Sequence, residues 1–135
     1  MLFYIKDYYP AIDPLLSTSR IMDPAIIGRK HYDVACGVRD LLRRYREIQE
    51  SAPDSKPRQL GAADLTLVAR ARKIQRFFSQ PFAVAEAFTG RPGEVVPLAE
   101  TIRACQALLA GAYDNVPEDA FMWRGTIDQV MARPA

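Results

Sequence analysis

The chain has 135 residues and a mass of 15.2 kDa, with 49% apolar and 25% charged residues, which is the size and composition of one folded domain. Lys and Arg number 18 and Asp and Glu number 16, so the net charge of +2 is too small to indicate a nucleic-acid or membrane-surface partner. The length also leaves little room for a complete nucleotide-hydrolysing domain, which needs a parallel sheet covered by helices. Any active site is therefore expected to be shared with other chains or domains.

The first half of the chain predicts an arm followed by a long helix. Residues 1–22 are expected to be extended, because aromatic and β-prone residues there run into two prolines. Asp23 before Pro24 predicts a helix start, since the carboxylate accepts from free amides and a proline in the first turn loses no hydrogen bond. Apolar residues at three- and four-residue steps then predict one amphipathic helix that ends near Ser51, before two further prolines.

The second half predicts further helices. A helix over residues 60–78 should run antiparallel to the first one, and residues 82–88 predict a short apolar helix before a turn-rich connector. A proline at its start and a glycine after its end delimit a helix over residues 97–110, and a capping-box pattern predicts a last helix over residues 126–132. The predicted fold class is all-α, a small helical bundle with an extended N-terminal arm.

No residue pattern in the chain predicts catalysis or metal binding by the chain itself. None of the seven glycines opens a GxxxxGK[ST] phosphate loop, and no GxGxxG run is present. The single histidine, His31, is interpreted as a packing residue and not as a catalytic base. Cys36 and Cys105 show no metal-ligand spacing, so both are expected to be reduced, small core residues.

Basic side chains gather on the two long predicted helices. The clusters are Arg43, Arg44 and Arg46 on the first, and Arg70, Arg72, Lys73 and Arg76 on the second. At helical spacing they could form one positive face for phosphates, but a solvated face is the preferred interpretation because the net charge is low and no base-stacking array accompanies them.

One stretch stands out from this background. Residues 67–90 have the sequence LVARARKIQRFFSQPFAVAEAFTG, and further motifs lie at residues 9–15, 17–24, 31–35, 96–102 and 117–121. In order and spacing these motifs resemble the beta subunit of F-type ATP synthases, from Tyr9 to about Val130. The resemblance covers the C-terminal part of that subunit. It implies that residues 1–22 are an arm ending the nucleotide-binding domain and that residues 23–135 are the C-terminal helical domain.

The resemblance implies two kinds of functional residue. Family members line their adenine pocket with aromatic residues of the Tyr-Pro-Ala, Gln-Pro-Phe and Phe-Thr-Gly motifs, which correspond here to Tyr9, Phe82 and Phe88. Their flat rings can stack on a purine face. The family also contacts its rotating stalk through an acidic loop, and the corresponding residues here are Arg58, Gln59, Leu60 and Asp64. Asp64 is the only acidic residue left among these four.

The implied function is a share in proton-driven ATP synthesis or hydrolysis, with alpha and gamma subunits as partners and no nucleic acid. ATP or ADP with Mg²⁺ would bind the intact subunit, whereas this chain, without the phosphate loop, is expected to bind neither tightly and to catalyse nothing alone. The implied location is cytoplasmic, peripheral to the inner membrane through the complex. We expect a truncated or divergent copy, and the alternatives are a gene remnant or a non-enzymatic helical interaction module that binds an acidic partner through its basic faces.

Overall fold

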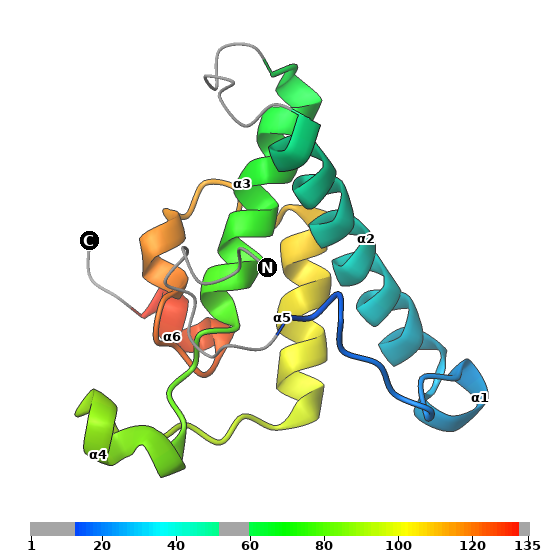
Figure 1. The fold of residues 1–135 in the computed structure, drawn as a ribbon. Coiled ribbons are helices and arrows are strands. Elements are labelled where there is room, and N and C mark those ends of the chain that lie inside the picture. The colour runs from blue at the N-terminus through cyan, green and yellow to red at the C-terminus, as the bar shows by residue number, and fades with distance from the viewer. Residues whose placement is uncertain (1–12, 52–59, 133–135) are drawn as a thin grey trace.

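The computed structural model describes residues 13–51 and 60–132, and all regular elements in these stretches are helices. In chain order they are α1 (Pro24–Ile27), α2 (Arg29–Ser51), α3 (Ala62–Phe77), the 3₁₀ helix η3 (Ala83–Ala85), α4 (Glu86–Thr89), α5 (Leu98–Ala110), the 3₁₀ helix η4 (Glu118–Phe121) and α6 (Ile127–Met131) (Figure 1). The all-α prediction is confirmed for this part of the chain. None of these helices is both long and apolar enough to cross a lipid bilayer.

The predicted helix ends agree with the capping groups in the structure. The Asp23 carboxylate accepts a 2.7 Å hydrogen bond from the Ala25 amide at the start of α1. At the start of α6, Thr126 and Gln129 form the predicted capping box, in which each side chain accepts from the other residue's backbone N–H. Gly111 ends α5 with a φ of +85°, a conformation that glycine adopts at little cost.

The prediction of one uninterrupted helix from Asp23 to Ser51 is wrong, because the chain turns sharply at Gly28. Gly28 has φ +85° and ψ 150°, and its amide donates to the Pro24 carbonyl to close the four-residue α1. α2 then begins at Arg29 in a new direction (Figure 1). The glycine permits this break because it has no Cβ to oppose a positive φ.

The core lies where α3 meets its neighbours. α3 packs against α2, α5 and η4, with α2 and α3 running antiparallel as predicted (Figure 1). Ala71 and Ile74 of α3 are fully buried, and Leu108 of α5 and Phe121 of η4 cover them in one apolar cluster. η4 was not predicted as a helix, yet it contributes Phe121, one of the largest fully buried side chains.

The described part of the arm, residues 13–22, forms turns and no regular helix or strand. An ion pair of 2.8 Å between the Asp13 carboxylate and the Arg46 guanidinium attaches it to α2. Burial would raise the pKa of Asp13, but hydrogen bonds from the Leu15 amide and from Arg46 outweigh it and lower that pKa. The described part of the arm is therefore attached to the surface of α2 through its first residue, Asp13.

Candidate functional site

The segment with the predicted adenine-side aromatics projects from the bundle. η3 and α4 follow α3 and lie at the edge of the molecule, away from α2 (Figure 1). Neither helix contains a buried residue. Phe82, which precedes η3, is half-buried, whereas the Phe88 side chain on α4 is 91% exposed. The apolar pattern of residues 82–88 thus produces a surface and not a core helix.

Two hydrogen bonds close this segment into a compact loop. The Gly93 amide donates to the Glu86 carboxylate at 2.6 Å, and the Glu94 amide donates to the Pro81 carbonyl at 2.9 Å. A Cβ on Gly93 would overlap the backbone of Ala83, so only glycine fits at this close approach. The Phe88 ring is therefore carried by a short helix whose two flanks are joined to each other.

Other exposed apolar residues occur close to Phe88 in the chain. Val84 of η3 is 89% exposed and Val95 of the connector is 92% exposed, and Leu98 at the start of α5 is also exposed. Scattered exposed apolar residues are normal on a protein, but this stretch of 15 residues contains four of the nine large exposed ones in the described chain. Residues 84–98 thus carry the densest run of exposed apolar side chains along the described chain.

Of the three predicted adenine-side residues, the structure describes Phe82 and Phe88. Tyr9 lies outside the described residues. A ring contact joins Tyr113 and Phe121, edge-on at 6.5 Å, and among the described residues no such contact is found between Phe82 and Phe88. They share one short segment, with one ring half-covered and the other facing solvent.

The basic cluster on α3 is only in part the solvated face that we predicted, because Arg72 is exposed whereas Lys73 is buried. The Arg70 guanidinium forms a two-armed ion pair with the Asp114 carboxylate, at 2.8 and 2.5 Å, and also donates to the Leu109 carbonyl. The Lys73 side chain is buried, and its ammonium donates to the carbonyls of Tyr113 and Asp114 at 2.9 and 2.7 Å. These contacts fasten the loop after α5 onto α3.

The pKa values in this cluster follow from the same contacts. The hydrogen bond from Arg70 lowers the pKa of the Asp114 carboxyl, and the charge of Lys73 adds to this effect. Burial lowers the pKa of the Lys73 ammonium, although the charge of Asp114 opposes the change. Asp114 thus neutralises part of this cluster, and the Lys73 ammonium is hydrogen-bonded within the fold instead of being open to a phosphate.

The other two cations of this cluster contact η4. Arg72 and Arg76 both face the Glu118 carboxylate, at 2.9 and 3.6 Å, and Arg76 also donates to the Met122 sulfur. All four basic residues of this cluster on α3 thus form ion pairs or hydrogen bonds with other parts of the chain. Periodicity could not predict this, because the acidic partners lie more than 40 residues further along the chain.

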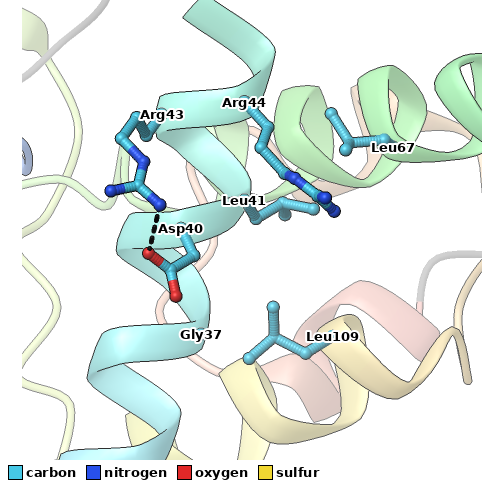
Figure 2. Close-up of a pocket in the computed structure, with 7 residues that line it drawn as sticks. All are labelled: Gly37, Asp40, Leu41, Arg43, Arg44, Leu67 and Leu109. Atoms are coloured by element: carbon cyan, nitrogen blue, oxygen red, sulfur yellow. Dashed lines mark ion pairs between the residues drawn. The ribbon is translucent and has the colours of Figure 1, made fainter.

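The basic cluster on α2 borders an open hollow of about 380 Å³ between α2, α3 and α5. Figure 2 shows Arg43 paired with Asp40, at 3.1 Å, while the Arg44 side chain extends toward Leu67. A Cβ on Gly37 would lie 2.9 Å from Leu109 Cδ1, so this glycine lets α2 and α5 approach closely. The hollow has mixed charge at its rim, and neither Phe82 nor Phe88 lines it.

Of the four predicted stalk-contact residues, the structure describes Leu60 and Asp64, which lie at the start of α3. Arg58 and Gln59 lie outside the described residues. Leu60 is half-buried just before α3, and Asp64 is exposed in the first turn of that helix. A carboxylate there interacts favourably with the positive end of the helix dipole. Of the predicted stalk contacts, the start of α3 thus carries one apolar side chain, Leu60, and one acidic side chain, Asp64.

The two cysteines and the single histidine lie in positions that give no sign of catalysis or metal binding. Cys105 is buried in the core, and burial raises the pKa of its thiol to about 11, so the reactive thiolate is disfavoured. Cys36 and His31 are half-buried on α2. Over residues 13–51 and 60–132 no group of three or more His, Cys, Asp and Glu side chains is arranged to hold a metal ion.

A comparison of the chain with models of known protein families gives no match. The interpretation of the site therefore depends on the motifs in the sequence and on where the fold places them. Among the residues named by those motifs, Phe88 has the most informative position, because a large aromatic side chain on a short, tethered helix faces solvent almost completely.

Proposed function

We propose that this chain is a C-terminal helical domain of the ATP synthase beta-subunit type, which contributes the adenine side of a nucleotide site. The exposure of Phe88 carries the proposal, because a ring that stacks on a ligand must face solvent before the ligand arrives. The half-buried Phe82 would supply the edge of the same surface, with Tyr9 as the third aromatic. Burial of both phenylalanines in the core would have argued against this function.

The proposal assigns only the adenine side to this chain. Aromatic rings suit a purine, whereas the described residues offer no metal-ligand cluster, and the sequence has no phosphate loop. The triphosphate and Mg²⁺ would be held by other domains of an intact subunit. Alone, the chain should release no phosphate from ATP above a buffer control, and sustained turnover by purified protein would contradict this assignment.

The expected affinity follows from the number of contacts. Stacking contributes about 0.5–1.5 kcal/mol per aromatic pair beyond the burial of area, whereas a Kd of 1 mM already requires about 4 kcal/mol. Two rings with partial burial of the base therefore give adenosine a Kd of about 1 mM or weaker. Micromolar binding to the isolated chain would mean that groups other than these rings hold the ligand.

Ligand-observed NMR tests the adenine contact directly. Adenosine at millimolar concentration should receive saturation transfer from the protein at its purine protons, and Phe88→Ala should remove most of this signal. Ile26→Ala is the matched control, because Ile26 is another exposed apolar residue on a short helix, α1, far from α4 (Figure 1). An unchanged signal in Phe88→Ala, or an equal loss in both variants, would refute the proposed contact.

We also propose that the α2–α3 end contacts the stalk through Leu60 and Asp64, with alpha and gamma subunits as the partners. Support comes from the position of both residues at the start of α3, next to the connection between the two long helices. Co-purification of the tagged chain with these subunits tests the assembly. Recovery of the chain without either subunit from cells that express all three would contradict it.

The alternative of a phosphate-binding basic face has less support. Its strongest part, the α3 cluster, is occupied by Asp114, by Glu118 and by backbone carbonyls. Binding to arbitrary DNA with a steep salt dependence that Arg72→Ala weakens would favour the alternative over the adenine site.

A further inference from the structure

The connector after α4 is held to the C-terminal segment by a cation–π contact. The Arg91 guanidinium lies over the Trp123 ring, 5.0 Å from its centroid. Arg91 is exposed and stands three residues after Phe88, whereas Trp123 is half-buried beyond η4. A cation at this distance from an indole face is attracted by the ring's quadrupole.

Trp123 is a fixed platform for this contact. Its φ of +61° is the one positive φ found for a non-glycine residue in the described chain, and such a conformation is disfavoured for a bulky side chain. It is maintained because the Trp123 amide donates to the buried Ser79 hydroxyl at 3.3 Å, and Ser79 in turn donates to the Arg76 carbonyl at the end of α3. The Ser79 hydroxyl thus joins the Trp123 backbone to the end of α3.

The other attachments of this segment are near its base. The Glu86 carboxylate accepts from the Gly93 amide, and the Glu94 amide donates to Pro81. The Glu94 carboxylate also accepts from the Gln129 side chain at 3.2 Å. These bonds close the loop and join its base to α6, but α4 itself has η3 as its main neighbour. Arg91 therefore supplies a contact between the tip of the segment and the body of the domain.

We propose that Arg91 is a positioning residue that acts through Trp123 to hold α4, and hence the Phe88 ring, in one orientation toward its ligand. The effect on ligand binding rests on the proposed adenine function, whereas the effect on α4 does not. The Arg91–Trp123 contact reduces the number of orientations that the exposed Phe88 ring samples before binding. A ring that is already oriented loses less freedom when the purine arrives, so its affinity is higher.

The test compares Arg91→Met, which replaces the cation by a shorter, unbranched apolar side chain, with Arg91→Lys, which restores a cation. Arg20→Met is the matched control, because Arg20 is an exposed arginine in the arm. In the full-length chain, amide hydrogen exchange of Gly90 and Gly93, which donate to the backbone and side chain of Glu86, reports on α4. Trp123 is the only tryptophan of the chain, so its fluorescence reports on the contact itself.

We expect Arg91→Met to change the Trp123 emission and to speed exchange at Gly90 and Gly93 by about twofold to fivefold, the range for losing one exposed cation–π contact. The Tm should fall by no more than about 4 °C, exchange of the α5 amides should change by no more than the same factor, and Arg91→Lys should restore most of the protection. Adenosine binding should weaken by a similar factor in Arg91→Met only. A purely structural role would instead lower the Tm by more than this and speed exchange throughout the bundle by a larger factor.

Each result has a defined meaning. Wild-type exchange rates at Gly90 and Gly93 in Arg91→Met would refute the proposal that Arg91 holds α4, independently of the adenosine-binding result. If the wild-type chain shows no adenosine binding, the proposed adenine function fails, and the exchange data alone decide whether Arg91 holds α4. Faster exchange with unchanged adenosine binding refutes the positioning role toward the ligand.

Discussion

The Lys73 ammonium joins α3 to the loop after α5, and replacing it by methionine removes that link with little change in side-chain size. Two hydrogen bonds from a charged donor are lost, each worth about 1.5–3 kcal/mol, and the carbonyls of Tyr113 and Asp114 lose this donor. Relief of the burial cost that lowers the Lys73 pKa offsets part of this loss. We therefore expect Lys73→Met to reduce the free energy of unfolding by about 2–4 kcal/mol.

Urea titration followed by circular dichroism at 222 nm measures this change, with a thermal melt as the second measurement. For a domain of this size, about 3–4 °C of Tm corresponds to each kcal/mol, so the Tm should fall by roughly 6–16 °C. Lys30→Met is the control, because Lys30 is an exposed residue of α2 and its replacement should change the stability by no more than about 0.5 kcal/mol. Equal stabilities of Lys73→Met and Lys30→Met would refute the structural role of the buried ammonium.

Three further changes probe other parts of the fold. Phe121→Ala empties a fully buried site on η4 and should destabilise the chain by about 3–5 kcal/mol in urea titration; a loss below about 1 kcal/mol would show that η4 does not complete the core. Thr126→Ala removes the side-chain cap of α6 and should cost about 1 kcal/mol, with Thr126→Ser as the rescuing variant, and equal stability of the two would contradict the capping role. Because its pKa is lowered in the folded chain, Asp114 stabilises the fold above its unfolded pKa of about 3.9, and this contribution is lost as the pH falls through the lower folded pKa. The drop in Tm between pH 6 and pH 2.5 should therefore be smaller in Asp114→Asn than in wild type, and an identical drop would refute the assignment.

Local capping signals predicted three of the helix boundaries, the start of α1, the end of α5 and the start of α6. Asp23, Gly111 and Thr126 each act within four residues of their own position, so the pattern alone contains the physics that ends or starts the helix. The break at Gly28 was missed because a glycine within an apolar periodic pattern is also compatible with a continuous helix. Its positive φ becomes visible only in three dimensions.

The sequence motifs name candidate site residues but do not predict where the fold places them. The Phe-Thr-Gly motif drew attention to Phe88, yet helical periodicity cannot distinguish a ring that packs into a core from one that faces solvent. Lys73 shows the opposite failure, because a lysine among arginines predicts an exposed face, whereas its burial depends on carbonyls 40 and 41 residues away in sequence. The Arg91–Trp123 contact likewise joins residues that are far apart in the sequence, so no local sequence pattern predicts it.

Photolabelling tests the central claim, an adenine surface at α4, most directly. An azido-adenosine would be irradiated with the full-length chain at millimolar concentration, with and without excess adenosine, and the modified peptides identified by mass spectrometry. The account predicts adenosine-protected label on residues 82–90, and loss of that label in Phe88→Ala. Protected label confined to the Arg43–Arg44 side of α2, with residues 82–90 unmodified, would contradict it.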